Sequence, residues 1–92
     1  MSPLSEQQID AHLKVVPAWK VDSGELTRTF SFKDFREALE FVNKVGELAE
    51  GAGHHPDIDI RYNRVRLALV THDAGGLTAK DFELASAVDK LV

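Results

Sequence analysis

Three of the four histidines are the residues of this sequence best suited to chemistry, because they fall in or beside predicted loops. His54 and His55 are adjacent in one loop, and His72 lies in another, directly after a predicted strand. Histidine has an unperturbed pKa of about 6.5, so it can both donate and accept a proton near neutral pH. A histidine cluster of this kind would suit general acid–base catalysis on one small molecule.

The two adjacent histidines are expected to point in different directions. Pro56 disfavours helical backbone at His55 and pushes that residue toward an extended conformation. Neighbouring side chains of an extended segment project to opposite sides. We therefore expect His54 and His55 to have different roles.

Two carboxylates could support the histidines. Glu50 stands at the end of a predicted long helix, where an acid opposes the helix dipole. Because this position is unfavourable for the helix, we expect Glu50 to have a functional role as a supporting carboxylate. Asp81 has two interpretations, since it also occupies the third position of a helix capping pattern. By contrast, His12 stands among predicted helical positions and is expected to be structural.

A metal site is the rival interpretation of three histidines with nearby carboxylates. Zinc ligands typically stand four residues apart on a helix or in paired knuckles. Adjacent histidines that point apart fit those arrangements poorly. We therefore expect no metal.

The helices that position these residues are predicted by a repeated pattern, in which Ser or Thr is followed three residues later by Gln or Asp. The pattern resembles a capping box flanked by apolar residues. Its copies are Ser5–Gln8, Ser31–Asp34 and Thr78–Asp81. We expect a helix to begin at the hydroxyl residue of each copy. The first should end before Pro17, and Gly51 is the natural residue to end the second.

The second predicted helix carries a wide apolar stripe at helical spacing. The stripe comprises Phe35, Ala38, Leu39, Val42, Val45 and Ala49, and it is widened by Phe41 and Leu48. This arc is wider than packing on one sheet requires. We therefore expect Phe41 and Leu48 to flank a contact between subunits.

Four strands are predicted at residues 19–21, 26–30, 58–62 and 65–69, with hairpin turns at 22–25 and 63–64. The order is α-β-β-α-β-β-α, which favours an α+β fold with a four-stranded antiparallel sheet and three helices packed on one face. Trp19 and Tyr62 are expected to be core or sheet-face aromatics. Because the last two strands form a hairpin, the two histidine loops should meet at its open end.

Composition excludes several classes of function. The 92 residues predict a single domain, residues 1–92, and carry a net charge of −4 without a basic block, which argues against nucleic-acid binding. No apolar stretch approaches the ~20 residues of a membrane span, and the N-terminus does not resemble a signal peptide, so we expect a cytoplasmic protein. There is no cysteine, so disulfides cannot stabilise so small a core, and we expect a homodimer or homotetramer.

Several of these residues together resemble the signature of a known protein family. The string Glu50-x3-His54-His55-Pro56-x5-Tyr62-x9-His72-x8-Asp81 resembles the signature of the pterin-4a-carbinolamine dehydratase family, and the likeness extends from Trp19 to the C-terminus. This resemblance implies an α+β fold, a pterin substrate and no cofactor. It also implies dehydration of 4a-hydroxytetrahydropterin to quinonoid dihydropterin, which a reductase then recycles.

The resemblance also implies roles for individual residues. His54 and His72 match the principal acid–base histidines of the family, although which one donates and which accepts stays open. The family's substrate contacts match His54, His55 and Pro56, together with Thr71, His72, Asp73 and Ala74. Glu50 and Asp81 match supporting positions.

A non-catalytic interaction module is the alternative function. Some proteins that resemble this family act as transcriptional coactivators or as assembly factors, and the assembly factors lack the active-site histidines. Because His54, His55 and His72 are all present here, a purely structural role is disfavoured. The identity of the physiological pterin stays open.

Overall fold

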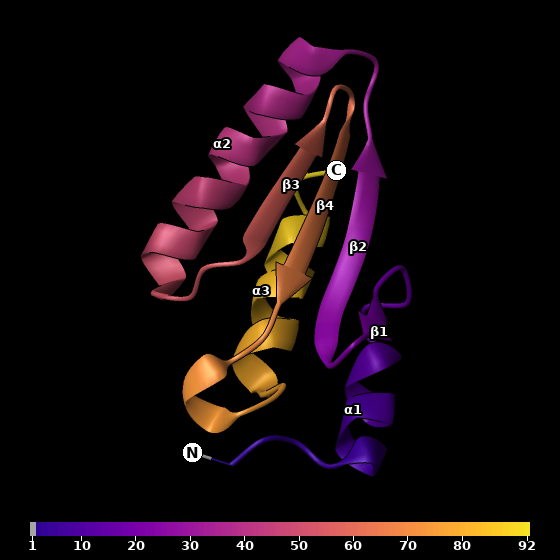
Figure 1. Ribbon diagram of the computed structural model, residues 1–92, viewed down its shortest axis with the longest axis vertical. Coiled ribbons are helices and arrows are strands. Elements are labelled where there is room, and N and C mark those ends of the chain that lie inside the picture. The colour runs from indigo at the N-terminus through magenta and orange to yellow at the C-terminus, as the bar shows by residue number, and fades with distance from the viewer. Residues whose placement is uncertain (1) are drawn as a thin grey trace.

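Three helices and four strands alternate in the order α-β-β-α-β-β-α in the computed structural model, which describes residues 2–92 (Figure 1). The α+β class and the order of the elements are as predicted. The elements are α1 (Glu6–Leu13), β1 (Lys20–Asp22), β2 (Glu25–Ser31), α2 (Phe35–Ala52), β3 (Asp57–Arg61), β4 (Arg64–Leu69), the single 3₁₀ turn η1 (His72–Ala74) and α3 (Ala79–Asp89).

The strands form one antiparallel sheet in the order β1-β2-β4-β3. Strand β4 lies inside the sheet and pairs with β2 from Leu26↔Leu69 to Ser31↔Arg64. Its other neighbour, β3, begins with the pair Asp57↔Ala68. The end of β4 and the start of β3 therefore lie at one end of the sheet, and the segments before β3 and after β4 are brought together there.

The core forms between one face of the sheet and the helices. Strand residues alternate toward it, and α3 passes behind the sheet in Figure 1. Trp19 is buried as predicted, and its indole N–H donates to Asp89 Oδ1 at 2.8 Å. The buried cluster includes Leu26, Phe30, Val65, Leu67 and Leu69 from the sheet, Ala38, Phe41 and Val45 from α2, and Phe82, Leu84, Ala85 and Val88 from α3.

Two of the three predicted helix starts are confirmed. Ser5 caps α1 with Gln8 in a reciprocal capping box, and α3 begins directly after Thr78. The prediction at Ser31 is wrong, because Ser31 still pairs with Arg64 in the β2–β4 ladder. Helix α2 instead begins after Asp34, whose side chain accepts the N–H of Glu37 at 3.0 Å.

The predicted end of α2 is also wrong by one half-turn. Gly51 lies inside the helix, which continues to Ala52 and ends at Gly53 with a left-handed φ of +63°. The N–H of His54 then donates to the carbonyl of Ala49 at 3.2 Å. Because this closure satisfies a terminal carbonyl of the helix, it sets the direction in which the chain leaves α2.

The second hairpin turns one residue earlier than predicted. The pair Arg61↔Arg64 closes the β3–β4 ladder, so Tyr62 and Asn63 form the turn. Tyr62 has a φ of +52° and a 67% exposed side chain, so its prediction as a core or sheet-face aromatic is wrong. Asn63 anchors the turn by donating from Nδ2 to the Phe32 carbonyl at 2.8 Å.

The apolar stripe of α2 is divided differently from the prediction. Phe41 is buried within this chain, with its ring 4.6 Å from that of Phe30 and 4.9 Å from that of Phe32, so its assignment to a subunit contact is wrong. The large apolar residues of α2 that remain exposed are Phe35 and Leu39. Among residues 2–92, no helix has the length and apolar character needed to cross a membrane.

Candidate functional site

The three loop histidines line one cavity at the end of the sheet, which we call the histidine cleft. Its volume is about 290 Å³. His54 and His55 come from the segment between α2 and β3, and His72 comes from the segment after β4. The two loops therefore meet as the hairpin geometry predicted. The lining residues are Gly53, His54, His55, Val70, Thr71, His72, Asp73 and Lys80.

His54 is held by a buried carboxylate from α3. Its Nε2 lies 2.5 Å from Oδ1 of Asp81, which is 0% exposed, while the imidazole itself is 12% exposed. The other oxygen of Asp81, Oδ2, accepts the Thr78 N–H and the Thr71 hydroxyl, each at 2.9 Å. Asp81 thus caps α3 and orients His54 at the same time, so both interpretations of this residue have a structural basis.

His55 points elsewhere and has a different partner. Its Nε2 lies 2.5 Å from Oε2 of Glu50, in the last turn of α2. Both side chains of this pair are exposed, at 60% and 76%. The expectation that His54 and His55 project in different directions is confirmed. Glu50 pairs with His55 rather than with His54.

His72 lines the histidine cleft from the 3₁₀ turn η1. The turn is closed by an isolated bridge between Thr71 and Gly76, in which the Thr71 N–H donates to the Gly76 carbonyl at 3.2 Å. Gly75 permits the closure with a φ of +75°. The His72 side chain is exposed, and its ring makes no hydrogen bond to any residue between 2 and 92.

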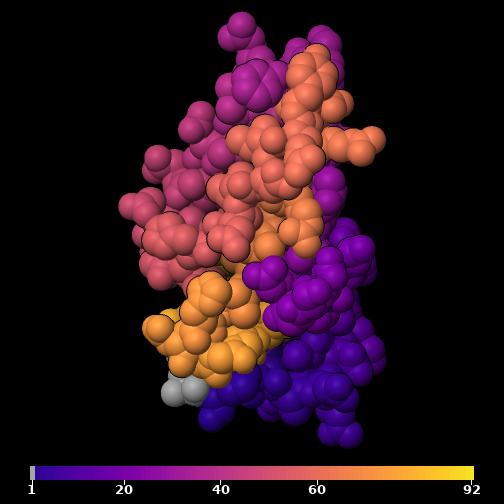
Figure 2. Space-filling model, viewed as in Figure 1, coloured from indigo at the N-terminus to yellow at the C-terminus, as the bar shows by residue number. Residues whose placement is uncertain are grey.

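The N-terminal segment packs beneath the loop that carries His72. The N–H of Leu4 donates to the carbonyl of Leu77 at 2.8 Å. In Figure 2 the indigo N-terminal residues lie against the orange and yellow segment of the chain. This contact ties the far side of the His72 loop to the start of the chain.

Only some of the predicted substrate contacts line the histidine cleft. Thr71 and Asp73 line the histidine cleft with the histidines, whereas Pro56 and Ala74 do not. Lys80 is a lining residue that the sequence reasoning missed. Its position next to Asp81, at the start of α3, was the available signal.

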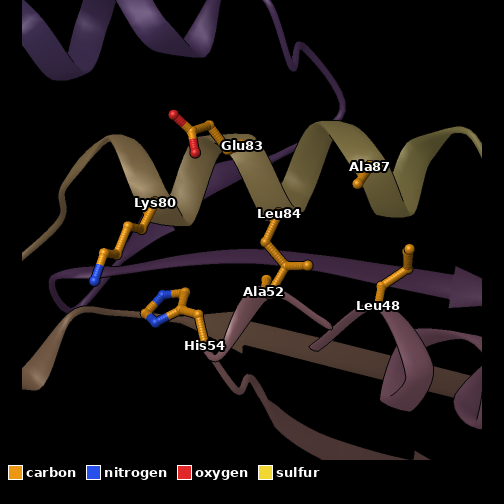
Figure 3. A pocket seen from close by; sticks show the side chains of 7 residues that line it. All are labelled: Leu48, Ala52, His54, Lys80, Glu83, Leu84 and Ala87. Carbon is orange, nitrogen blue, oxygen red and sulfur yellow. The ribbon is translucent and has the colours of Figure 1, made fainter. Parts of the chain in front are cut away.

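A second cavity adjoins the histidine cleft between the end of α2 and α3. It has a volume of about 260 Å³ and shares His54 and Lys80 with the cleft. Figure 3 shows Leu48 and Leu84 facing this space from opposite sides, with His54 and Lys80 at one end. We call it the adjoining groove; its walls are mainly apolar and comprise Leu48, Ala52, His54, Lys80, Glu83, Leu84 and Ala87.

The arrangement is suited to proton transfer. The imidazole of His54 is fixed by a buried carboxylate, that of His72 is exposed, and both line one small cavity. Within the part of the chain described, residues 2–92, no three histidine, aspartate or glutamate side chains are grouped so as to hold a metal ion. General acid–base chemistry on a ligand in the histidine cleft is what these histidines can support.

Comparison with known proteins gives a consistent result. The family model described as pterin 4 alpha carbinolamine dehydratase matches residues 2–91. Proteins provisionally named pterin-4-alpha-carbinolamine dehydratase are similar over the whole chain. One from Acidobacterium capsulatum is 59% identical, covering 100% of both chains, and one from Chloroflexus aurantiacus is 58% identical, covering 100% of this chain and 99% of its own.

Two solved structures are also similar. A transcriptional coactivator/pterin dehydratase from Brucella melitensis superposes with a TM-score of 0.92 and 34% identity, covering 98% of each chain. A pterin dehydratase-like protein that is a RuBisCO assembly factor in the α-carboxysome superposes with a TM-score of 0.65 and 23% identity, covering 79% of this chain and 84% of its own. At that identity the second likeness concerns the fold alone.

Proposed function

The chain belongs to the pterin-4a-carbinolamine dehydratase family of hydro-lyases, and from this premise we propose that it removes water from a 4a-hydroxytetrahydropterin by general acid–base catalysis. His54 and His72 carry the two proton transfers. The observation that carries this proposal is that both imidazoles line one small cavity, together with His55.

The reaction requires two proton movements. The C4a–O bond breaks as one imidazolium protonates the departing hydroxide, which leaves as water. N5 of the pterin loses its proton to a neutral imidazole, and the electron pair of that N–H bond forms the new double bond between N5 and C4a. The product is the quinonoid dihydropterin. No electron acceptor, metal or nucleotide is needed for this balance.

The surroundings of each histidine support this division of work. Asp81 orients His54 through their hydrogen bond, and the exposed His72 lines the cleft without a competing hydrogen bond from residues 2–92. His55, Thr71 and Asp73 line the same space and contact the bound pterin in this proposal. Pro56 and Ala74 shape the two loops from outside the cavity.

An interaction role is the second candidate, and the name of the Brucella melitensis structure, which pairs coactivator with dehydratase, is the observation in its favour. The exposed apolar residues Phe35 and Leu39 on α2 could serve a partner protein. Such a role would add to catalysis, since the residues proposed for catalysis lie beyond the opposite end of α2.

Stopped-flow absorbance tests the proposed activity. After exhaustive chelation, the protein should accelerate dehydration of synthetic 4a-hydroxytetrahydropterin without added nucleotide. The variant His54→Ala/His72→Ala, with its folding checked by circular dichroism, is the control. Activity that disappears with chelator and returns with zinc would overturn the cofactor-free mechanism, and absence of acceleration would overturn the proposed activity.

A further inference from the structure

The hydrogen bonds around Asp81 determine which nitrogen of His54 is available for chemistry. Asp81 is fully buried, and Thr71 and Thr78 are each 6% exposed. Among residues 2–92, every buried side-chain nitrogen or oxygen has a hydrogen-bond partner. The protons of this cluster can therefore be assigned one by one.

The assignment begins at Asp81 Oδ2. This oxygen accepts from the Thr78 N–H, which can only donate, and from the Thr71 hydroxyl. A hydroxyl has a single proton, so the Thr71 proton is committed to Asp81. The hydrogen bond of 2.8 Å between the two threonine hydroxyls must then run from Thr78 to Thr71.

The other oxygen of Asp81 completes the assignment. An ionised aspartate has only acceptor oxygens, so the proton between Asp81 Oδ1 and His54 Nε2 belongs to the histidine. Neutral His54 therefore carries its proton on Nε2, and its Nδ1 has a free lone pair. Nδ1 is the one nitrogen of this ring left to exchange a proton with a ligand.

We infer that Thr71 and Thr78 are positioning residues that saturate Asp81 Oδ2 with donors, fix the tautomer of His54, and leave Nδ1 as its working nitrogen. The inference rests on the proposed function for its catalytic meaning, but the tautomer is a property of the free protein. Thr71 also closes the loop that bears His72 through its bridge to Gly76. The buried carboxylate of Asp81 therefore positions His54 directly and the loop of His72 through Thr71.

The substitution Asp81→Asn gives the sharpest test. The two donors of Thr71 and Thr78 require the amide oxygen of Asn to face them, so the amide NH₂ must face His54. Nε2 must then accept, and the proton moves to Nδ1. We expect kcat to fall by about 10²–10⁴-fold, as when a histidine base is held in the wrong tautomer.

Nitrogen NMR of the histidine side chains measures the tautomer without substrate, at about pH 8.5, where histidines are ordinarily neutral. The expected spectra place the His54 proton on Nε2 in the parent protein and on Nδ1 in Asp81→Asn. Retention of the Nε2 proton in Asp81→Asn, or an Nδ1 proton in the parent, would overturn the inference. If the tautomer inverts but the parent shows no dehydratase activity, the inference stands and the proposed function fails.

Substitutions at Thr71 keep the inference testable should Asp81→Asn fail to fold. Thr71→Val retains the shape and a methyl group but removes the hydroxyl, whereas Thr71→Ser retains the hydroxyl and removes the methyl group. We expect Thr71→Val to lower kcat about tenfold, the usual effect of losing one hydrogen bond to a charged group. Thr71→Ser should restore most of that loss.

A matched control is available at Thr27, which is also buried but lies in β2 outside the histidine cleft. Thr27→Val should leave kcat and the His54 tautomer unchanged. A loss for Thr71→Ser at least as large as that for Thr71→Val would show that the hydroxyl alone does not account for the effect, and would overturn the positioning role. Unchanged kcat in a folded Thr71→Val protein would overturn it as well.

Discussion

At the scale of single residues, two adjacent histidines differ because their partners differ. His54 is mostly buried on Asp81, whereas His55 is exposed and pairs with an exposed Glu50. Even a charged pair of exposed side chains contributes only about 0–1 kcal/mol to stability, because solvent screens it. The His55–Glu50 pair therefore serves orientation more than folding, while the His54–Asp81 pair belongs to the buried structure.

The proposed proton transfers predict the kinetics of alanine variants at His54 and His72. Each variant should lower kcat by about 10²–10⁴-fold, the usual contribution of a well-placed acid or base. KM should change much less, since the loss is confined to the transition state. The double variant should lose less than the product of the single losses. Wild-type kcat in both folded single variants, measured by steady-state kinetics, would contradict the acid–base roles.

His55 should behave as a positioning residue. Its alanine variant is expected to raise KM more than it lowers kcat, because the side chain lines the histidine cleft at its exposed side. Glu50→Gln, which removes the charge of its partner, should shift KM in the same direction by a smaller factor. A His55→Ala variant with a large kcat defect and an unchanged KM would assign it to the chemistry instead.

Asp81→Ala should affect stability and catalysis together. It leaves the buried donors of Thr71 and Thr78 without an acceptor, at a cost of about 1–3 kcal/mol for each unsatisfied group. Asp34→Ala is the matched control, because Asp34 caps α2 far from the histidines and its loss should cost about 0.5–2 kcal/mol with normal kcat. Denaturant melts and steady-state kinetics measure both effects. A destabilised Asp81→Ala protein with normal kcat would restrict Asp81 to capping.

At the scale of elements, the end of α2 sets the position of His54. The helix stops at Gly53, and the N–H of the next residue returns to Ala49. The cavity lining then begins immediately, with Gly53 itself. The geometry of one helix terminus is therefore part of the histidine cleft.

Two glycines of α2 provide a matched test of this terminus. A methyl group at either Gly51 or Gly53 would meet no atom within 4 Å, so only the backbone conformation differs between them. Gly51→Ala lies in the helix and should stabilise the protein by about 0.5–1 kcal/mol. Gly53→Ala requires a left-handed alanine and should destabilise it by about 1–2 kcal/mol, and should lower kcat by displacing His54. Equal effects in denaturant melts would contradict this account.

At the scale of the whole molecule, the chain buries a small core and leaves apolar side chains outside it. Phe35 is 45% exposed and Leu39 is 38% exposed on α2, and Ile58 is 38% exposed on the edge strand β3. The chain also has no disulfide. These features suit a subunit of a larger assembly. The contact that we now predict involves Phe35 and Leu39, near the start of α2, in place of Phe41.

We therefore still predict at least a homodimer. Light scattering at micromolar concentration should give a mass of at least twice 10.2 kDa. Leu39→Glu should lower that mass by placing a charge in the contact, whereas Val15→Glu, which changes a residue exposed beside α1, should not. The melting temperature should rise with protein concentration. A mass near 10 kDa for the unmodified chain would contradict the prediction.

Much of the fold was predictable because its signals act over a few residues. The capping patterns at Ser5 and Thr78 mark real helix starts, and alternation predicts the strands. Hairpin geometry alone brings His54 and His72 to one end of the sheet. Where a local signal for a helix start or a turn conflicted with strand pairing, the pairing between strands determined the structure. Ser31 was kept in a strand by its partner Arg64, and the ladder of β3 and β4 moved Tyr62 into a turn.

The inner arrangement of the site depended on the tertiary structure. The sequence by itself determined that histidines and carboxylates gather in two loops and at the start of a helix. It could not determine that Asp81 orients His54 while Glu50 pairs with His55, because His54 and Asp81 are 27 residues apart and belong to segments that only packing brings together. Whether a hydrogen-bonding carboxylate faces one imidazole or its neighbour is decided by how α3 packs against the end of α2.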